Sequence, residues 1–324
     1  MVSGPRIDVH LTADDLRAAL RDDVAVGLTS TPKELPPKWF YDERGSELFA
    51  EIMRLPEYYP TERERAILRR HATDIAARPV HTFVELGAGS AEKTRWLLDA
   101  LSARAGLARY VPFDVSEAFL RSVAAQLAAD YPALDIHGVV GDFERHLEDV
   151  PDGRPRLIAL MGGTIGNFAP GERKRFLSAV ADQLEPGDGF LLGTDLVKDR
   201  KRLVAAYDDR AGVTAEFNRN VLHVVNRELR ADFVPDRFDH VARWDATNEW
   251  IEMRLRSSGR QRVRLRELAL DVVFEDGEEM RTEISAKFRR EGVEAELAAA
   301  GLELAEWWTD YAADFAVSLS TLRQ

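Results

Sequence analysis

Residues 81–101 read HTFVELGAGSAEKTRWLLDAL, a stretch that passes from an apolar run through a glycine-rich turn into an amphipathic segment. The apolar run predicts a buried strand, and leucines at helical spacing predict a helix after the turn. The glycines let a ligand approach the backbone closely, and the free N–H groups of the turn and of the helix N-terminus suit a nucleotide-like ligand. The stretch therefore predicts a strand–turn–helix unit that binds such a ligand, without choosing which one.

Short apolar runs and helix-like segments alternate from Phe83 to Thr194. This alternation is typical of a parallel sheet with helices on both faces. Further along, the apolar runs LAEWWTD at 304–310 and DFAVSLS at 314–320 predict an antiparallel edge of the same sheet. The fold class we expect is α/β, a doubly wound and mostly parallel Rossmann-like sheet. Its five central strands are expected at Thr82–Leu86, Arg109–Asp114, Ile136–Val140, Leu157–Met161 and Gly189–Thr194.

Four candidate ligand residues stand at or just after the ends of these strands: Gly87, Asp114, Asp142 and Asn167. Ligands of doubly wound sheets bind beyond the carboxyl ends of the strands. We therefore expect these four residues along one rim of the sheet.

Residues 198–285 do not follow the alternation. Their first part has helical spacing, whereas the later segments WIEMRLRS, QRVRLRELALDVVF and GEEMRTEISAKF alternate with a period of two. We expect an inserted α+β domain here. The expected division gives 61–197 and 286–324 to the sheet domain, and 1–60 and 198–285 to a second domain that recognises the substrate.

The composition excludes several classes of protein. The chain has 324 residues, a formal net charge of −12 and no dense Lys/Arg block, so binding to nucleic acid is not expected. It has no cysteine, and its seven histidines form no HxH or HxxxH pair, so we expect neither disulfides nor a metal. No signal peptide and no membrane-spanning run of about 18 apolar residues is visible. We expect a cytoplasmic monomer that acts on a small molecule away from membranes.

The glycine-rich turn itself indicates the cofactor. Glu92 stands where a dinucleotide fingerprint would need its third glycine, so NAD and a dehydrogenase are disfavoured. Glu85 before the turn, Asp114 at the second strand end and the stretch GDFE at 141–144 are typical of S-adenosylmethionine enzymes of this architecture. Lys93 is a candidate partner for the cofactor carboxylate. Each feature is weak alone, because Asp114 and Asp142 could instead be helix caps, but together they favour S-adenosylmethionine.

Several long stretches carry a more specific resemblance: TPKELPPKWFYDERGSELF, LPEYYPTERE, VELGAGSAEKTR, GDFERHL, GTIGNF, LLGTDLVKD, AYDDRAGVTAEFNRNVL, VVNRELRADF and GEEMRTEISAKF. With them the chain closely resembles the L-histidine Nα-methyltransferases of ergothioneine biosynthesis over nearly its whole length. The resemblance implies an S-adenosylmethionine-dependent enzyme that trimethylates L-histidine to hercynine, the first step of ergothioneine biosynthesis.

The resemblance also implies the residues of both sites. Those implied to bind S-adenosylmethionine are Gly87, Lys93, Asp114, Asp142 and Phe143. Those implied to bind histidine are Tyr58, Asn167, Tyr207, Glu283 and Ser285, with Tyr41 and Met253 near the pocket. Of these, Tyr58 and Asn167 are the candidates to hold a water that takes the proton of the amine, so both are counted as catalytic.

The predicted strand GEEMRTEISAKF supports the histidine site on physical grounds. A period of two puts Arg281, Glu283, Ser285 and Lys287 on one face. A carboxylate accepts from an imidazole N–H, and a serine hydroxyl can accept from or donate to the second ring nitrogen, so we expect the pair to bind both ends of the ring and to tolerate its charged form. The alternative is an exposed polar face of an edge strand.

Other interpretations stay open at this stage. Asn167 could be a turn residue, Tyr207 could pack in a core, and Met253 alternates with apolar neighbours as core residues do. The chain could methylate a different amino acid or amine, or it could be a non-catalytic S-adenosylmethionine-binding module.

Overall fold

We describe residues 4–89, 91–104 and 106–323 of the protein from a computed structural model, so Ser90 of the glycine-rich turn lies outside the described residues. The chain divides into two compact units. The first unit comprises Met1–Thr12, Glu62–Leu196 and Phe288–Gln324, and the second comprises Ala13–Thr61 and Val197–Lys287.

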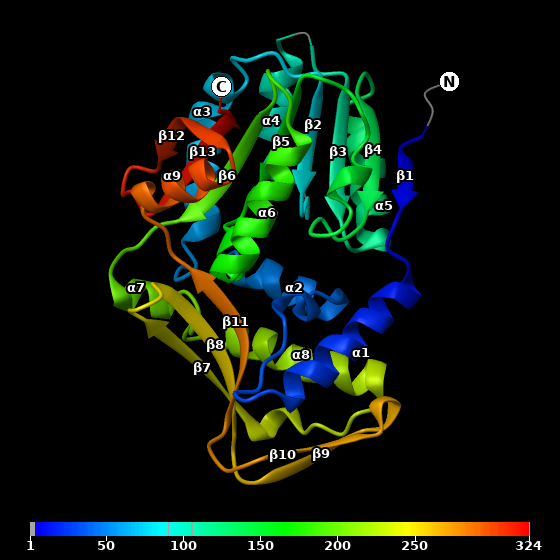
Figure 1. Cartoon of the computed structure of the whole chain (residues 1–324), viewed down its shortest axis with the longest axis vertical. Helices are drawn as coiled ribbons and strands as arrows, with labels where there is room; N and C mark the ends of the chain where they lie inside the picture. Colours follow the sequence, from blue (N-terminus) through cyan, green and yellow to red (C-terminus); the bar gives the residue numbers. More distant parts are fainter. Residues whose placement is uncertain (1–3, 90, 105, 324) are drawn as a thin grey trace. The chain divides into compact units, whose positions relative to one another are not determined.

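The first unit is built on one large sheet, which has eight strands in the described part of the chain, in the order β1-β4-β3-β2-β5-β6-β13-β12 (Figure 1). The strands from β1 to β6 run parallel, whereas β13 is antiparallel to β6 and β12 is antiparallel to β13. The strands are β1 (Arg6–Val9), β2 (Thr82–Leu86), β3 (Arg109–Asp114), β4 (Asp135–Val140), β5 (Arg156–Leu160), β6 (Gly189–Asp195), β12 (Leu302–Thr309) and β13 (Phe315–Leu322). This confirms the predicted fold class and its antiparallel C-terminal edge.

Helices cover both faces of this sheet. Buried side chains of α3, α4 and α5 share one apolar cluster with Leu191. Phe190, the neighbour of Leu191, points to the opposite face. There its ring lies 6.3 Å from the ring of Phe176 on α6, which crosses in front of the sheet in Figure 1. The helices of this unit are α3 (Pro60–Ile75), α4 (Thr94–Ser102), α5 (Glu117–Asp130), α6 (Pro170–Gln183) and α9 (Arg290–Ala299), with short 3₁₀ turns η2 (Leu147–Asp149) and η3 (Thr164–Asn167).

The N-terminal strand differs from the expected domain boundary. The sequence assigned residues 1–60 to the second domain, but β1 pairs with β4 in parallel, with Arg6 opposite His137 and Val9 opposite Val140. The side chain of Asp8 also contacts His137 Nε2 at 2.6 Å. Because β4 would otherwise be the edge of the sheet, its unpaired backbone groups favour the addition of this strand.

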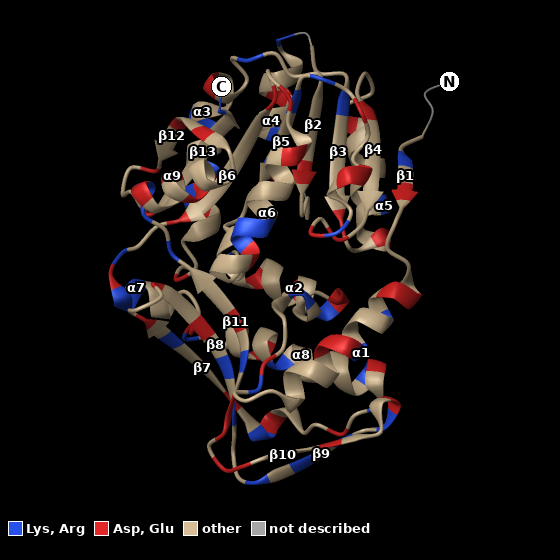
Figure 2. Ribbon diagram, viewed as in Figure 1, with Lys and Arg blue, Asp and Glu red and all other residues tan. Residues whose placement is uncertain are grey.

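The second unit combines helices with two small sheets. In the described residues β11, β8 and β7 form a three-stranded antiparallel sheet, and β9 and β10 form a hairpin. Figure 2 shows both signs of charge intermixed on β7, β8 and β11. The elements are α1 (Ala13–Thr29), η1 (Pro37–Phe40), α2 (Glu43–Ile52), α7 (Arg200–Ala205), α8 (Val213–Leu229), η4 (Pro235–Arg237), β7 (Phe238–Asp245), β8 (Trp250–Ser257), β9 (Gln261–Leu265), η5 (Arg266–Leu268), β10 (Leu270–Phe274) and β11 (Glu279–Ala286).

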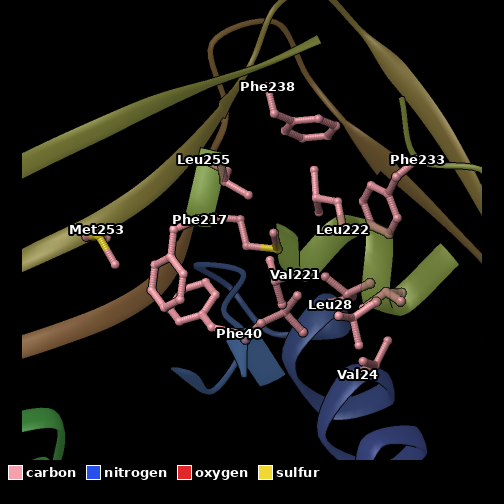
Figure 3. Packing of buried hydrophobic residues seen from close by; sticks show 14 of the residues in the cluster. Val24, Leu28, Phe40, Phe217, Val221, Leu222, Phe233, Phe238, Met253 and Leu255 are labelled. Carbon is pink, nitrogen blue, oxygen red and sulfur yellow. The ribbon is translucent and has the colours of Figure 1, made fainter. Parts of the chain in front are cut away.

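Helix α8 is the centre of this unit. Phe217, Val221 and Val225 recur every four residues and are at most 2% exposed, so they place one face of α8 in the core. Figure 3 shows this face among Val24 and Leu28 of α1, Phe40 of η1, and Met253 and Leu255 of β8. The core thus fixes the position of the strands that carry the candidate substrate residues.

Strand β11 does not keep one alternation along its length. Arg281 pairs with Arg254 and Glu283 pairs with Met253, so one residue of β11 is left over between them as a β-bulge. Residues directly opposite each other in a sheet share a face. Glu283 therefore points to the face of Met253, whereas Arg281 points to the other face.

The prediction that Arg281 shares a face with Glu283 is thus wrong, and the bulge is the physical reason. The prediction that Glu283 and Ser285 point together holds, because Ser285 pairs with Ile251, which shares the face of Met253. Met280, expected on the opposite face, pairs with Leu255 and lies on this same buried face.

Candidate active site

The glycine-rich turn follows β2 in the first unit. Gly87 and Gly89 have φ angles of +69° and +52°, which side chains rarely adopt. No heavy atom lies within 4 Å of the place where a Cβ would stand on either glycine. The Gly87 N–H donates to Phe113 O at 2.9 Å, which ties the turn to β3. The turn therefore presents open backbone at the carboxyl end of β2, as a closely approaching ligand requires.

Asp114 ends the neighbouring strand and stands beside this turn. Its Oδ2 accepts from Gly89 N at 3.3 Å, and its Oδ1 accepts from Ser116 N at 3.0 Å. Burial raises the pKa of Asp114, although these backbone donors act in the opposite direction. Oδ1 and Oδ2 each keep a further lone pair for a ligand such as a pair of ribose hydroxyls.

The next strand along the sheet, β4, ends at Val140, and Asp142 and Phe143 follow in the loop after it. Asp142 Oδ1 accepts from Glu144 N at 3.0 Å, and Asp142 N donates to His146 Nδ1 at 3.1 Å. The ring of Phe143 makes edge contacts with the rings of Phe113, Phe168 and Phe176, at centroid distances of 6.4, 6.3 and 5.8 Å. A half-buried aromatic ring beside a fixed carboxylate suits a flat heterocycle with a hydrogen-bond donor.

Lys93 stands just before α4, and the structure gives it a partner that the sequence did not reveal. Its Nζ contacts Glu64 Oε2 of α3 at 2.5 Å, and Glu64 Oε1 accepts from Gly162 N at 2.7 Å. Glu64 is 1% exposed. This carboxylate therefore links Lys93 to the loop after β5, the same loop that leads to Asn167 in η3.

Glu85 lies beneath the turn and is fully satisfied by the protein. Thr94 Oγ1 lies 2.8 and 2.7 Å from its two carboxylate oxygens, and Tyr110 donates to Oε2 at 2.6 Å. Burial raises the pKa of Glu85 to about 7 against these bonds. The network fastens the start of α4 to β2 and β3, which makes Glu85 a structural residue of the turn.

Glu283 in the second unit has a different environment. It is 8% exposed, and none of the residues that the structure describes donates a hydrogen bond to its carboxylate. Burial raises its pKa to about 8, and the nearby charge of Lys287 acts in the opposite direction. A buried acceptor without a protein donor is costly unless a ligand supplies one.

Three polar groups meet next to this carboxylate. Tyr207 Oη and Ser285 Oγ are 2.6 Å apart, and Lys287 Nζ donates to both, at 2.9 and 2.8 Å. All three side chains are at most 8% exposed. Lys287 was not among the predicted site residues, although its place in the apolar run ISAKF, two residues after Ser285, was a usable signal.

The remaining candidates of this unit surround the same group. The ring of Tyr58 lies 6.4 Å from that of Tyr207, and Met253 is the cross-strand neighbour of Glu283. Tyr41 is 39% exposed as a whole residue, but desolvation of its hydroxyl and, after it, the charge of Glu283 raise the pKa of that hydroxyl. Tyr59, beside Tyr58, is the buried ring of the pair and accepts from Lys198 at 2.8 Å.

The structure therefore gathers the predicted residues into two groups. Gly87, Lys93, Asp114, Asp142, Phe143 and Asn167 belong to the first unit, along the carboxyl ends of neighbouring parallel strands. Tyr41, Tyr58, Tyr207, Met253, Glu283 and Ser285 belong to the second unit. Among the described residues no cluster of three His, Cys, Asp or Glu could hold a metal ion. No helix in the described ranges is long and apolar enough to cross a membrane.

The glycine-rich turn after β2 and the acidic residues Asp114 and Asp142 at the ends of the two neighbouring strands are those of an S-adenosylmethionine-dependent methyltransferase of the α/β class. The family to which the chain belongs is narrower. Residues 20–322 match the family of SAM-dependent, histidine-specific methyltransferases, and the chain is a member of it.

Individual relatives agree with this assignment. The chain is 57% identical to a histidine N-alpha-methyltransferase from Mycobacterium tuberculosis and 58% identical to one from Mycolicibacterium smegmatis, each over 312 residues. Both alignments cover 96% of this chain and 97% of the relative. It is also 30% identical over 286 residues to ergothioneine biosynthesis protein 1 of Neurospora crassa, which covers 86% of this chain and 32% of that longer protein.

Proposed function

We propose that the protein transfers three methyl groups from S-adenosylmethionine to the α-amino group of L-histidine and so produces hercynine, the first step of ergothioneine biosynthesis. The family and the named relatives support the reaction. The observation that carries the choice of histidine is Glu283, a buried carboxylate to which no described residue donates a hydrogen bond. An imidazole N–H supplies that donor.

The first unit carries the proposed cofactor site. Gly87 leaves the backbone open, Asp114 accepts from the ribose hydroxyls, and Lys93 pairs with the cofactor carboxylate. Asp142 and Phe143 hold the adenine through a hydrogen bond and ring contact. The bound sulfonium supplies a methyl group that an amine nitrogen takes by in-line displacement, so the residues of the chain act mainly by positioning.

The second unit carries most of the proposed substrate site. Glu283 and Ser285 bind the two ends of the imidazole ring, and Tyr207 and Asn167 donate to the substrate carboxylate. Met253 and Tyr41 complete the surroundings of the ring. A site built around hydrogen bonds rejects analogues that leave its polar groups unpaired, by about 10⁴- to 10⁵-fold.

Three rounds of transfer need a nucleophilic nitrogen in each round. An ammonium has no lone pair, so a water held by Tyr58 or Asn167 accepts the proton of the amine, and in this sense both are catalytic. The mono- and dimethyl forms of histidine keep a lone pair and remain substrates. Trimethylhistidine has none, which ends the sequence of transfers.

We further propose that the enzyme works as a monomer in the cytoplasm and binds neither nucleic acid nor membranes. The net charge of −12 supports the absence of a nucleic-acid partner. Both proposed sites are built from residues of this one chain, which supports a monomer. The proposed substrate, L-histidine, is itself a small molecule.

Mass spectrometry of products tests the reaction. Purified protein is incubated with S-adenosylmethionine and an equimolar mixture of the twenty amino acids. We expect histidine alone to gain one, two and then three methyl groups. Methylation of a different amino acid would overturn the substrate site but keep the cofactor site, and binding of S-adenosylhomocysteine without any turnover would favour a non-catalytic binding module.

A further inference from the structure

The contact between Ser285, Tyr207 and Lys287 bears on which protonation state of the substrate ring the site accepts, and it argues against the expectation from the sequence that the charged ring is tolerated. Ser285 Oγ lies 2.6 Å from Tyr207 Oη and 2.8 Å from Lys287 Nζ. An ammonium has hydrogen-bond donors and no acceptor, so Lys287 uses one lone pair of Ser285 Oγ. The direction of the hydroxyl contact decides the use of the other lone pair.

Tyr207 is the better donor of the two hydroxyls, because a phenol is more acidic than an aliphatic alcohol. Its oxygen also accepts from Lys287 at 2.9 Å, which strengthens its O–H as a donor. Tyr207 therefore donates to Ser285. With both lone pairs of Ser285 Oγ engaged, the hydroxyl retains its O–H alone, so toward a ligand Ser285 is a donor.

The two residues proposed to bind the ring, Glu283 and Ser285, then need opposite hydrogen-bonding partners from it. Glu283 presents at least one acceptor oxygen in either protonation state, and Ser285 donates, while both lie on the same face of β11. A neutral imidazole has one N–H and one lone pair and satisfies both residues. An imidazolium has two N–H groups and would direct one of them at the Ser285 donor, close to the Lys287 ammonium.

We infer that Lys287 is a positioning residue that makes Ser285 a hydrogen-bond donor, so that the enzyme selects histidine with a neutral imidazole ring. This inference rests on the proposed function and adds a specificity to the same site. It depends on the arrangement of three buried polar groups, all at most 8% exposed.

Other titratable groups face this cluster, and the experiment must separate them from the ring. Glu283 stands on β11, Tyr41 follows η1, and Tyr58 packs near Tyr207. His240 of β7 contacts Tyr207 O through Nε2 at 2.7 Å, and burial lowers its pKa. Titration of any of these groups affects every substrate alike, whereas titration of the imidazole affects histidine alone.

A histidine analogue that stays neutral therefore provides the test. In 3-(1,2,4-triazol-3-yl)alanine the ring keeps an N–H donor and a nitrogen acceptor but is not protonated between pH 5.5 and 8. With an imidazole pKa near 6.5, we expect the KM for histidine to rise about tenfold from pH 8 to pH 5.5. The KM for the analogue should change by less than half as much. An equal rise for both substrates, or no turnover of the analogue, would overturn the inference.

Lys287→Met tests the role of the ammonium itself. We expect the pH-dependent rise in the histidine KM to shrink from about tenfold to less than threefold, because Ser285 regains a lone pair that accepts from an imidazolium. Affinity for S-adenosylhomocysteine should stay within twofold. Lys287 Nζ lies 4.7 Å from the ring centroid of Tyr207, and Lys33 Nζ lies 5.0 Å from that of Phe274 in the same unit. Lys33→Met is therefore the matched control and should keep the wild-type profile.

The results separate the two proposals. If the wild-type enzyme does not methylate histidine, the proposed function fails. If it does so and Lys287→Met keeps the tenfold rise, only the role of Lys287 fails. The comparison of histidine with the analogue uses the wild-type enzyme, so it decides the selection of the neutral ring even if the variant does not fold.

Discussion

Glu85 in the first unit and Glu283 in the second are both buried glutamates with a raised pKa, about 7 and about 8. They differ in their donors. Thr94 and Tyr110 donate to Glu85, whereas no described residue donates to Glu283. Burial and a raised pKa alone therefore do not distinguish a structural carboxylate from a ligand-binding one. The number of protein donors does, because an acceptor that the fold leaves unsatisfied is available to a ligand.

The largest effect is expected for turnover by Glu283→Ala. Loss of the acceptor for the imidazole N–H should lower kcat/KM for histidine by roughly 10³- to 10⁴-fold. Binding of S-adenosylhomocysteine, measured by calorimetry, should be unchanged, because the proposed cofactor residues lie in the first unit. Unchanged turnover would show that Glu283 does not bind the substrate. The contrast between a structural Glu85 and a ligand-binding Glu283 would then fail.

The second effect concerns how stability depends on pH. The pKa of Glu283 is about 8 in the folded protein against an ordinary value of 4.5, so the folded state binds the proton more tightly than the unfolded state. Its contribution to stability is therefore full below about pH 4.5 and is lost as the pH rises to about 8, by roughly 3–5 kcal/mol. Glu283→Gln should remove this loss.

Urea unfolding at pH 5 and pH 8 measures this difference. Wild type should lose stability relative to Glu283→Gln between the two pH values. The exposed residue Glu291 in the first turn of α9 supplies a control, and Glu291→Gln should follow the wild type. A gap between wild type and Glu283→Gln that stays constant with pH would contradict the buried, unpaired state of this carboxylate.

The third effect is a loss of stability caused by a change at Glu85. Glu85→Ala leaves the hydroxyls of Thr94 and Tyr110 buried without their acceptor, which should reduce the free energy of unfolding by about 2–4 kcal/mol. The selectivity among amino acids should stay that of the wild type. A variant as stable as the wild type that has lost cofactor affinity would make Glu85 a ligand residue instead.

The smallest effect sharpens the comparison. Tyr110→Phe removes one donor and leaves Thr94 bonded to Glu85, so the expected destabilisation is about 1–2 kcal/mol. Thermal unfolding of this variant and of Glu85→Ala, measured side by side, separates the contributions of Tyr110 and Thr94 to the free energy of unfolding. The KM for histidine should not change, and a change of more than threefold would show that this network reaches the substrate site.

Much of the first unit could be predicted because its signals are local. Each strand of the parallel core is a short apolar run, and the turn after β2 carries its glycines in the sequence itself. Strand β1 was missed because RIDV is short and only partly buried, so its hydrophobic pattern is weak. Its pairing with β4 is a contact between residues more than a hundred positions apart, which no local pattern encodes.

The second unit was harder to predict in detail. The sequence indicated period-two stretches over β8, over β9 and β10 together, and over β11, without showing that β9 and β10 form a hairpin. Strand β7 reads FDHVARWD, with partly exposed residues over much of its length. The bulge in β11 has no mark in the sequence, because neither glycine nor proline stands between Arg281 and Glu283. Glu64 was also missed. The charged stretch TERERAILRR predicts a solvent-exposed helix face, and only the tertiary fold buries the Glu64 carboxylate.

The bulge in β11 also changes which alternate residues of the strand point to the face of Met253. Before the bulge, the residue on the face of Met253 is the even-numbered Met280, and after it the residues on this face are the odd-numbered Glu283 and Ser285. Deleting Thr282 would remove the extra residue and leave Arg281 opposite Arg254 and Glu283 opposite Met253, so both residues would keep their faces. If β11 instead kept its length and lost the bulge, Thr282 would stand opposite Met253 and Glu283 would turn to the other face. The same sequence would then offer the ligand a different set of side chains, with no substitution at all.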